Sequence, residues 1–216
     1  MYFYPVKLGL IPTSKDVLSN LTLSPETPNH MKHRKLTADE MNRKTPVENI
    51  TSAKMPIAVV LDNIRSLNNI GSVFRTCDAL GVGLLVLCGI SGTPPHREIH
   101  RTALGAEDSV VWCYYSRVEE ALSVLMKQGY SLYALEQATN SINLMSFTPP
   151  PNDKLAFIFG NEVKGVSEEV LGMTAGVLEV PQFGAKHSFN VAVTAGIVLW
   201  DTISKLNKKK KGCKHP

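Results

Sequence analysis

Three groups of polar side chains stand beside apolar runs of the chain, and together they hold the residue types that build active sites. Asn69 and Arg75 follow the first run, Glu162 follows a later one, and Ser188 and Asn190 precede the last long apolar segment. Amide, guanidinium, carboxylate and hydroxyl groups orient a ligand by hydrogen bonds and stabilise charge. Their positions near the ends of predicted strands indicate one shared site.

The elements that position these groups alternate between strand and helix from Pro56 onward. Short apolar runs typical of buried parallel strands occur at residues 57–61, 84–87, 110–114, 131–135, 155–159 and 177–180. Apolar residues at helical spacing predict helices at residues 69–80, 118–128, 167–171 and from 190 to about 206. Gly81 is expected to end the first helix. The pattern predicts an α/β domain with a parallel sheet.

Ligands of open parallel sheets bind beyond the carboxyl ends of the strands, so the loops after these strands are expected to carry the chemistry. No GxGxxG opens a helix after the first strand and no GxxxxGK[ST] occurs, which disfavours the common dinucleotide and P-loop sites. The four cysteines form no CxxC pair, so we expect neither a metal site nor a redox motif. Three of them fall in apolar runs, as reduced core residues do.

The formal net charge of +4 belongs mostly to the end of the chain. The last twelve residues hold six lysines and no acidic residue, so the remainder has 17 basic and 19 acidic side chains. Such an end is either a solvated tail or an arm that contacts RNA phosphates in a salt-dependent way. Both readings stay open.

Composition divides the chain into segments. We expect a weakly structured extension over residues 1–30, a short basic segment over 31–53, one folded domain over 54–206 and a Lys-rich tail over 207–216. Thr37 is a candidate N-cap of a short basic helix, and Met31 competes with Met1 as the natural start. No run approaches the roughly 18 apolar residues of a membrane span, and no signal-peptide pattern is present. A cytoplasmic protein without membrane contact is the expectation.

Three motifs, taken in chain order, resemble the signature motifs of one enzyme family. They are NNIGSVFRTCDALGV from Asn68, IFGNEVKGVSEEVL from Ile158 and VPQFGAKHSFNVAVTAGIVLWD from Val180. In order and spacing they are similar to the SpoU (TrmH-like) branch of the SPOUT RNA methyltransferases. The resemblance runs from about Lys54 to Asp201, and ALEQATNSINL from Ala134 looks like a connecting segment of this branch.

The resemblance implies an enzyme that uses S-adenosylmethionine to methylate the 2′-hydroxyl of a ribose in tRNA or rRNA. It also implies a C-terminal trefoil knot, which composition and periodicity do not indicate, and a homodimer with active sites at its interface. Carried over by position, the catalytic residues would be Asn69, Arg75, Glu162, Ser188 and Asn190. The usual leucine between the last two is Phe189 here. The cofactor would be bound by Leu135, Gly160, Asn161, Val180, Gln182, Phe189 and Val191.

In this chemistry the site must align a ribose hydroxyl with the methyl donor, because alignment near about 3 Å supplies much of the acceleration. Arg75 is expected to anchor the target phosphate and stabilise developing negative charge rather than act as a base, since guanidinium groups stay protonated. Glu162 would hold Asn69 or a backbone amide. Ser188 and Asn190 would bind ribose or phosphate and cap the following helix. No residue is singled out as the general base.

Other readings stay open beside this one. Taken alone, Asn190 is an ordinary N-cap, Glu162 a surface carboxylate and Arg75 an ion-pair residue, and only their joint occurrence favours a site. A non-catalytic RNA-binding scaffold or assembly factor with the same fold is the runner-up function, and a nucleotide-binding α/β enzyme of unrelated chemistry is the third. Residues 89–109 include His96, Arg97, His100 and Arg101, which fit an RNA contact and a surface helix equally well.

Overall fold

The computed structural model describes residues 33–37, 40–41, 43–185 and 188–212, which belong to two units. One unit ends at Arg43 and the other begins at Lys44. The extension expected over residues 1–30, together with His187 and Cys213, lies outside the described residues.

In the described part of the first unit, the chain turns at Glu40 and Met41. The Thr37 hydroxyl accepts the backbone N–H of Glu40, as expected of an N-cap, but the described residues form a turn where a helix was predicted. The guanidinium of Arg34 lies against Glu40 and, with the backbone N–H of Thr37, lowers the pKa of that carboxyl to about 2.

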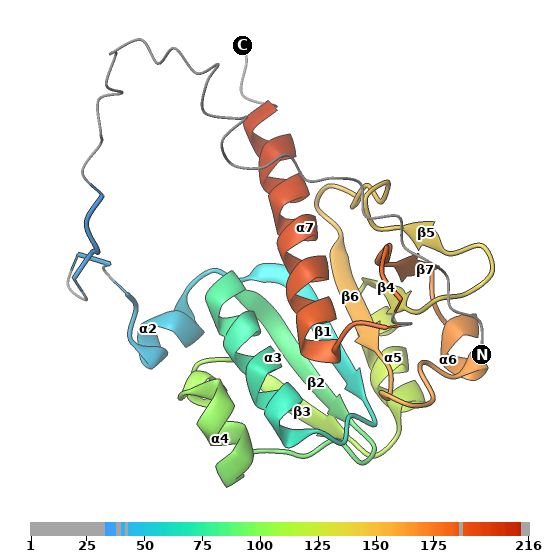
Figure 1. The fold of residues 1–216 in the computed structure, drawn as a ribbon, viewed down its shortest axis with the longest axis horizontal. Helices are drawn as coiled ribbons and strands as arrows, with labels where there is room; N and C mark the ends of the chain where they lie inside the picture. The colour runs from blue at the N-terminus through green and yellow to red at the C-terminus, as the bar shows by residue number, and fades with distance from the viewer. Residues whose placement is uncertain (1–32, 38–39, 42, 186–187, 213–216) are drawn as a thin grey trace, which may run out of the picture. The chain divides into compact units, whose positions relative to one another are not determined.

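One parallel sheet organises the second unit (Figure 1). All of its pairings are parallel, which confirms the predicted α/β class. The described strands lie in the spatial order β3 (Trp112–Tyr115), β2 (Val82–Cys88), β1 (Met55–Asp62), β6 (Lys154–Phe159), β4 (Tyr130–Leu135), β7 (Gly176–Glu179) and β5 (Ile142–Asn143). The six predicted runs correspond to six of these strands. β5 is two residues long, too short to leave a pattern in the sequence.

Helices cover both faces of the sheet (Figure 1). On one face, α3 (Leu67–Leu80), α4 (Arg97–Ala103) and α7 (Val191–Gly212) pack on the core that includes Val59, Leu61 and Phe157. On the other face, α5 (Val118–Lys127) and α6 (Glu168–Gly172) pack on alternate strand residues such as Val60 and Ile158. Side chains of a strand alternate between faces, so each buried strand serves two cores. Two further helical segments are described in the unit, α2 (Pro46–Thr51) and η2 (Ala106–Asp108).

The ends of α3 and α7 show how far local sequence decides helix length. Gly81 ends α3 in the left-handed conformation with φ 65°, as predicted. Helix α7 continues past Leu206, where we expected it to end, as far as Gly212. Lysine is a good helix former, so the Lys-rich stretch can prolong the helix where a tail was expected. None of the described helices has the length and apolar character that a membrane span requires.

The described cysteines are free thiols. Burial raises the pKa of Cys88 to about 12 and raises the pKa values of Cys77 and Cys113 as well. These thiols therefore stay protonated at neutral pH, as core residues do.

The expected trefoil knot stays a prediction, because strand order and pairing do not define how the chain is threaded.

Gly71 sets the distance between α3 and α4. A methyl group at this position would overlap the backbone oxygen of Ile99 and the side-chain oxygen of Thr102, both on α4. Only a residue without a side chain lets the two helices approach this closely. The place of α4 relative to α3 therefore depends on Gly71.

We predict that Gly71→Ala lowers the free energy of unfolding by about 1–3 kcal/mol, because the clash involves backbone and forces α4 outward. Urea denaturation measures this difference. Gly172→Ala is the matched control, since a methyl group there meets nothing within 4 Å. Equal stability of the Gly71→Ala variant and the wild type would show that α4 does not pack this tightly.

Candidate functional site

The first polar group lies at the start of α3. Ser66 is the N-cap of this helix, and its hydroxyl accepts the backbone N–H of Asn69 at 3.3 Å. The cap fixes the first turn, so Asn69 projects from a defined position at the carboxyl end of β1. Arg75 lies further along α3, on its exposed side.

The second polar group lies in a tight turn after β6. Asn161 pairs with Gly165 in an isolated bridge, and its Oδ1 accepts the backbone N–H groups of Val163 and Lys164 at 2.9 and 3.1 Å. Its Nδ2 donates to the backbone oxygen of Asn63 at 2.7 Å, which ties the turn to the end of β1. Glu162 stands exposed within this turn.

The third polar group begins α7. Oδ1 of Asn190 accepts the backbone N–H of Ala192 at 2.9 Å and that of Val193 at 3.4 Å. The Asn190 backbone oxygen accepts the N–H of Thr194. Asn190 is therefore the N-cap of α7, the structural role that its residue type favours.

A chain of two hydrogen bonds joins the three groups. Nδ2 of Asn190 donates to Oδ1 of Asn69 at 3.0 Å, and Nδ2 of Asn69 donates to Oε1 of Glu162 at 3.3 Å. Residues 121 and 93 positions apart in sequence thereby meet. We call Glu162, Asn69 and Asn190 the amide chain. Asn69 is the middle member and uses both ends of its side-chain amide.

A cleft of about 510 Å³ opens at the carboxyl ends of β4, β6 and β7, beside the amide chain. Its volume lies in the range of small-molecule sites. Leu178 and Thr194 line it together with the residues expected to bind the cofactor or to catalyse, which are Leu135, Gly160, Asn161, Glu162, Val180, Gln182, Ser188, Phe189, Asn190 and Val191. Asn69 reaches the cleft through its hydrogen bonds and is not one of the lining residues.

Arg75 stands apart from this cleft. It lines a separate hollow of about 650 Å³ between α3, α4 and α7, together with Arg101, Thr102 and Trp200. Its side chain has no hydrogen-bond or ion-pair partner in the described part of the chain. Within one chain, the structure therefore brings four of the five expected catalytic residues together and leaves Arg75 outside.

Glu136 is a cleft residue that we did not single out from the sequence. Its Oε1 accepts the N–H of Gln137 and its Oε2 that of Val166, both at 2.9 Å. A methyl group at Gly165 would overlap this carboxylate unless the Glu136 side chain moved, and the φ of 66° independently favours glycine in this turn. In the sequence, the place of Glu136 directly after a predicted strand is the feature that indicates a cleft residue.

The cleft has an acidic lining. Its described lining residues include Glu136, Glu162 and Glu179, and no lysine, arginine or histidine. Glu179 accepts the hydroxyl of Ser141 at 2.6 Å. Three carboxylates together with several large apolar residues favour a ligand with both cationic and apolar parts.

Asp62 ends β1 with 5% of its surface exposed. Burial is the main cause that raises the pKa of this carboxyl, and the nearby Glu119 adds to it. Among the described residues, no group of three histidine, cysteine or acidic side chains is placed to hold a metal ion. The chemistry that the described side chains offer is hydrogen bonding and charge stabilisation.

The fold and the site define an α/β protein with a ligand cleft at the carboxyl edge of a parallel sheet. Residues 56–200 match the model of the SpoU rRNA Methylase family. Because this match covers most of the chain, the protein belongs to the SpoU family.

Individual relatives agree with this assignment. The chain is 29% identical over 162 residues to a tRNA (guanosine(18)-2′-O)-methyltransferase of Thermus thermophilus, a match that covers 74% of this chain and 80% of that protein. The structure resembles the TrmH/SpoU tRNA modifying enzyme of A. aeolicus with a TM-score of 0.67 at 23% identity, over 76% and 82% of the two chains. It also resembles AviRb of Streptomyces viridochromogenes, solved in complex with AdoMet, with a TM-score of 0.65 at 20% identity, over 75% and 65%. The two structural likenesses show a shared fold.

We predict that Asn190→Ala lowers the free energy of unfolding by about 0.5–2 kcal/mol, because α7 loses its N-cap. Asn190→Ser lacks the amide donor that reaches Asn69 but keeps a capping oxygen. Because the cap is kept, this variant should retain most of the stability. Thermal unfolding of the two variants beside the wild type measures both differences. An alanine variant as stable as the serine variant would contradict the capping role.

Proposed function

We propose that this protein transfers a methyl group from S-adenosylmethionine to a ribose 2′-hydroxyl in tRNA or rRNA. The observation that carries the proposal is the amide chain, because it joins the three family motifs at the edge of one cleft. Family membership and the 2′-O-methyltransferase among the relatives support the reaction class. The cytoplasm, where tRNA and rRNA meet modifying enzymes, is the proposed location.

The cleft has the chemistry that S-adenosylmethionine requires. When bound, this cofactor supplies a methyl group on a positively charged sulfur. The acidic lining favours positive charge, while Leu135, Val180, Phe189 and Val191 offer apolar surface. The side-chain amide of Asn161 is committed to backbone partners, so we assign this residue to shaping the cleft rather than to contacting the ligand with its side chain.

The amide chain is proposed to position the reacting groups. The Asn69 side chain donates a hydrogen bond to Glu162 and accepts one from Asn190, so its amide is held from both sides. Ser188 lines the cleft near Asn190 and presents a hydroxyl that can bind ribose or phosphate. Holding the ribose in reacting geometry removes much of the entropic barrier to transfer.

Arg75 is proposed to enter the site of a second copy of the chain. Helix α7 exposes an apolar stripe in which Val193 is 51% and Trp200 65% exposed, with Gly196 between them. Such a stripe is typical of a surface that another protein covers. Arg75 lines the same hollow as Trp200, so a homodimer formed through this stripe would carry Arg75 towards the partner. There it would bind the target phosphate and stabilise charge on the ribose oxygen.

We predict that Arg75→Ala reduces methyl transfer to RNA by roughly 100-fold or more while leaving cofactor binding intact. Labelled S-adenosylmethionine and total RNA, followed by digestion to nucleosides, measure transfer and identify the methylated product. A thermal shift measures cofactor binding, since ligand at about 100 times its Kd adds about 2.7 kcal/mol of stability. Arg75→Lys keeps the charge without the planar fork and should retain part of the activity.

Unchanged transfer by the Arg75→Ala variant would refute the role of the arginine. A base-methylated nucleoside would overturn the ribose chemistry while keeping the cofactor. Cofactor binding without transfer to any RNA would favour the non-catalytic scaffold.

We predict that two inactive variants, Arg75→Ala and Asn69→Ala, regain activity when they are co-expressed with different tags and purified as a mixed population. A mixed dimer contains one site with neither substitution if Arg75 serves the partner, which gives roughly a quarter of the wild-type activity for random pairing. If Arg75 serves its own chain, every site carries a lesion and the mixture stays inactive. A monomeric mass by light scattering would also contradict this arrangement.

A further inference from the structure

Two exposed arginines on α4 lie on the same side of that helix. Arg97 and Arg101 are four residues apart, so their side chains are neighbours, and both are exposed. Like charges at this spacing repel each other and destabilise a helix. An external anion that bound both would remove this repulsion.

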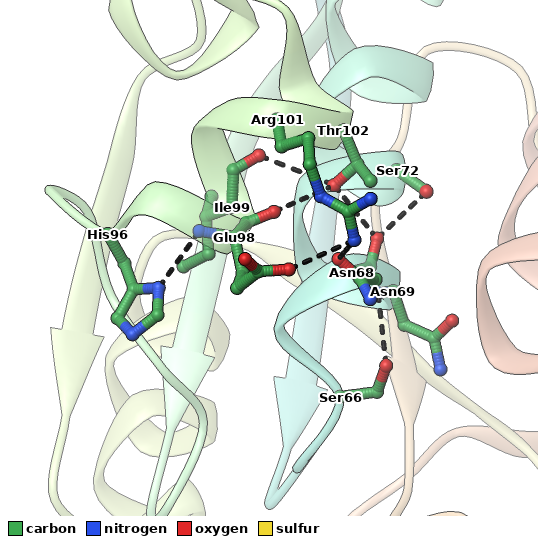
Figure 2. A network of polar contacts seen from close by, with 9 residues as sticks. All are labelled: Ser66, Asn68, Asn69, Ser72, His96, Glu98, Ile99, Arg101 and Thr102. Carbon is green, nitrogen blue, oxygen red and sulfur yellow. Dashed lines mark hydrogen bonds and ion pairs between the residues drawn. The ribbon is translucent and has the colours of Figure 1, made fainter.

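Arg101 is held in place rather than free in solvent. Figure 2 shows its Nη2 between the side chains of Glu98 and Asn68, to which it donates at 2.9 and 3.0 Å. Its Nε and Nη1 have no partner within the described residues, and 61% of the side chain is exposed. The guanidinium is therefore oriented by the protein while most of its donors remain available. Arg97 has no hydrogen-bond or ion-pair partner in the described part of the chain.

The support for Arg101 is continuous with the amide chain. The hydroxyl of Thr102 donates to the backbone oxygen of Asn68 at 3.1 Å (Figure 2). Gly71 allows α4 to lie directly on α3. Asn68 is adjacent to Asn69, the middle residue of the amide chain. The position of the Arg101 guanidinium is thereby fixed relative to the cleft edge.

Arg101 and Arg75 line one hollow from opposite helices. The hollow also has the side chains of Ser72, Thr76 and Thr102 on its walls. Arg75, Arg101 and Arg97 thus follow one another from α3 onto α4, and we call them the arginine track. Glu98, the acidic residue of α4, binds Arg101, and Glu107 of η2 binds His100.

We propose that the arginine track binds successive phosphates of the RNA backbone beside the target nucleotide, with Arg97 and Arg101 as positioning residues. This inference rests on the proposed function. A line of three exposed guanidinium groups fits a chain of phosphates, whereas a single small anion would need an enclosed site. Such contacts fix the register of the RNA on the enzyme and carry no base specificity.

The test compares the double variant Arg97→Ala/Arg101→Ala with the wild type, Arg101→Lys and Arg117→Ala. Arg117 is the matched control because it is 68% exposed, pairs with Glu119 and precedes α5 on the other face of the sheet. For each protein we would measure kcat and KM for RNA, the thermal shift with S-adenosylmethionine, and RNA affinity at several salt concentrations.

We expect the double variant to raise KM for RNA about tenfold, with kcat and the thermal shift unchanged, because two phosphate contacts are lost. The slope of log affinity against log salt should flatten by about 1.4–1.8, since each contact contributes about 0.7–0.9. Arg101→Lys keeps the positive charge, so its slope of log affinity against log salt should equal that of the wild type. Arg117→Ala should also match the wild type.

An unchanged salt slope and KM in the double variant would overturn the inference while the proposed function stands. A loss of kcat or of the thermal shift with an unchanged slope would also overturn it, because that pattern indicates a structural role for α4. If the wild type neither transferred a methyl group nor bound RNA, the proposed function itself would be refuted. The wild-type measurements therefore test the proposed function, and the double variant tests the arginine track.

Discussion

The arrangement of the site depends on the amide of Asn69, which accepts on one side and donates on the other. An ionised carboxylate can only accept, and a hydroxyl donates and accepts through one oxygen. The side-chain amide has a separate donor and acceptor, so it connects the donor Asn190 to the acceptor Glu162. Each partner comes from a different segment, and each segment follows or precedes a different element of the sheet. These two hydrogen bonds hold one residue of each family motif at the edge of the same cleft.

Much of this was predictable because the signals are local. The apolar runs of β1 and β6 are continuous, as strands buried on both faces must be, and Gly81 ends α3 in the one conformation that glycine adopts easily. The cleft residues followed from their places at strand ends together with the family motifs. Asn190 as an N-cap was likewise readable from residue type and position.

The remainder depends on distances that a single sequence does not encode. Arg75 belongs to the same motif as Asn69, but six residues of helix carry it out of the cleft and into another hollow. Glu136 lies directly after a predicted strand, but its contact with the turn at Gly165 depends on a close approach that the sequence does not show. The continuation of α7 beyond Leu206 was hidden because a run of lysines predicts a solvated surface and is equally compatible with helix.

The length of helix α7 also separates the cleft from the exposed lysine near the other end of the helix. It starts at the cleft with Val191 and carries the exposed Lys208 near its other end, and a rise of about 1.5 Å per residue separates the two by roughly 25 Å. A cofactor-sized molecule in the cleft cannot span that distance, so it leaves the charge at the far end of the helix unaffected. A ligand that contacts both ends of this helix must extend over roughly 25 Å.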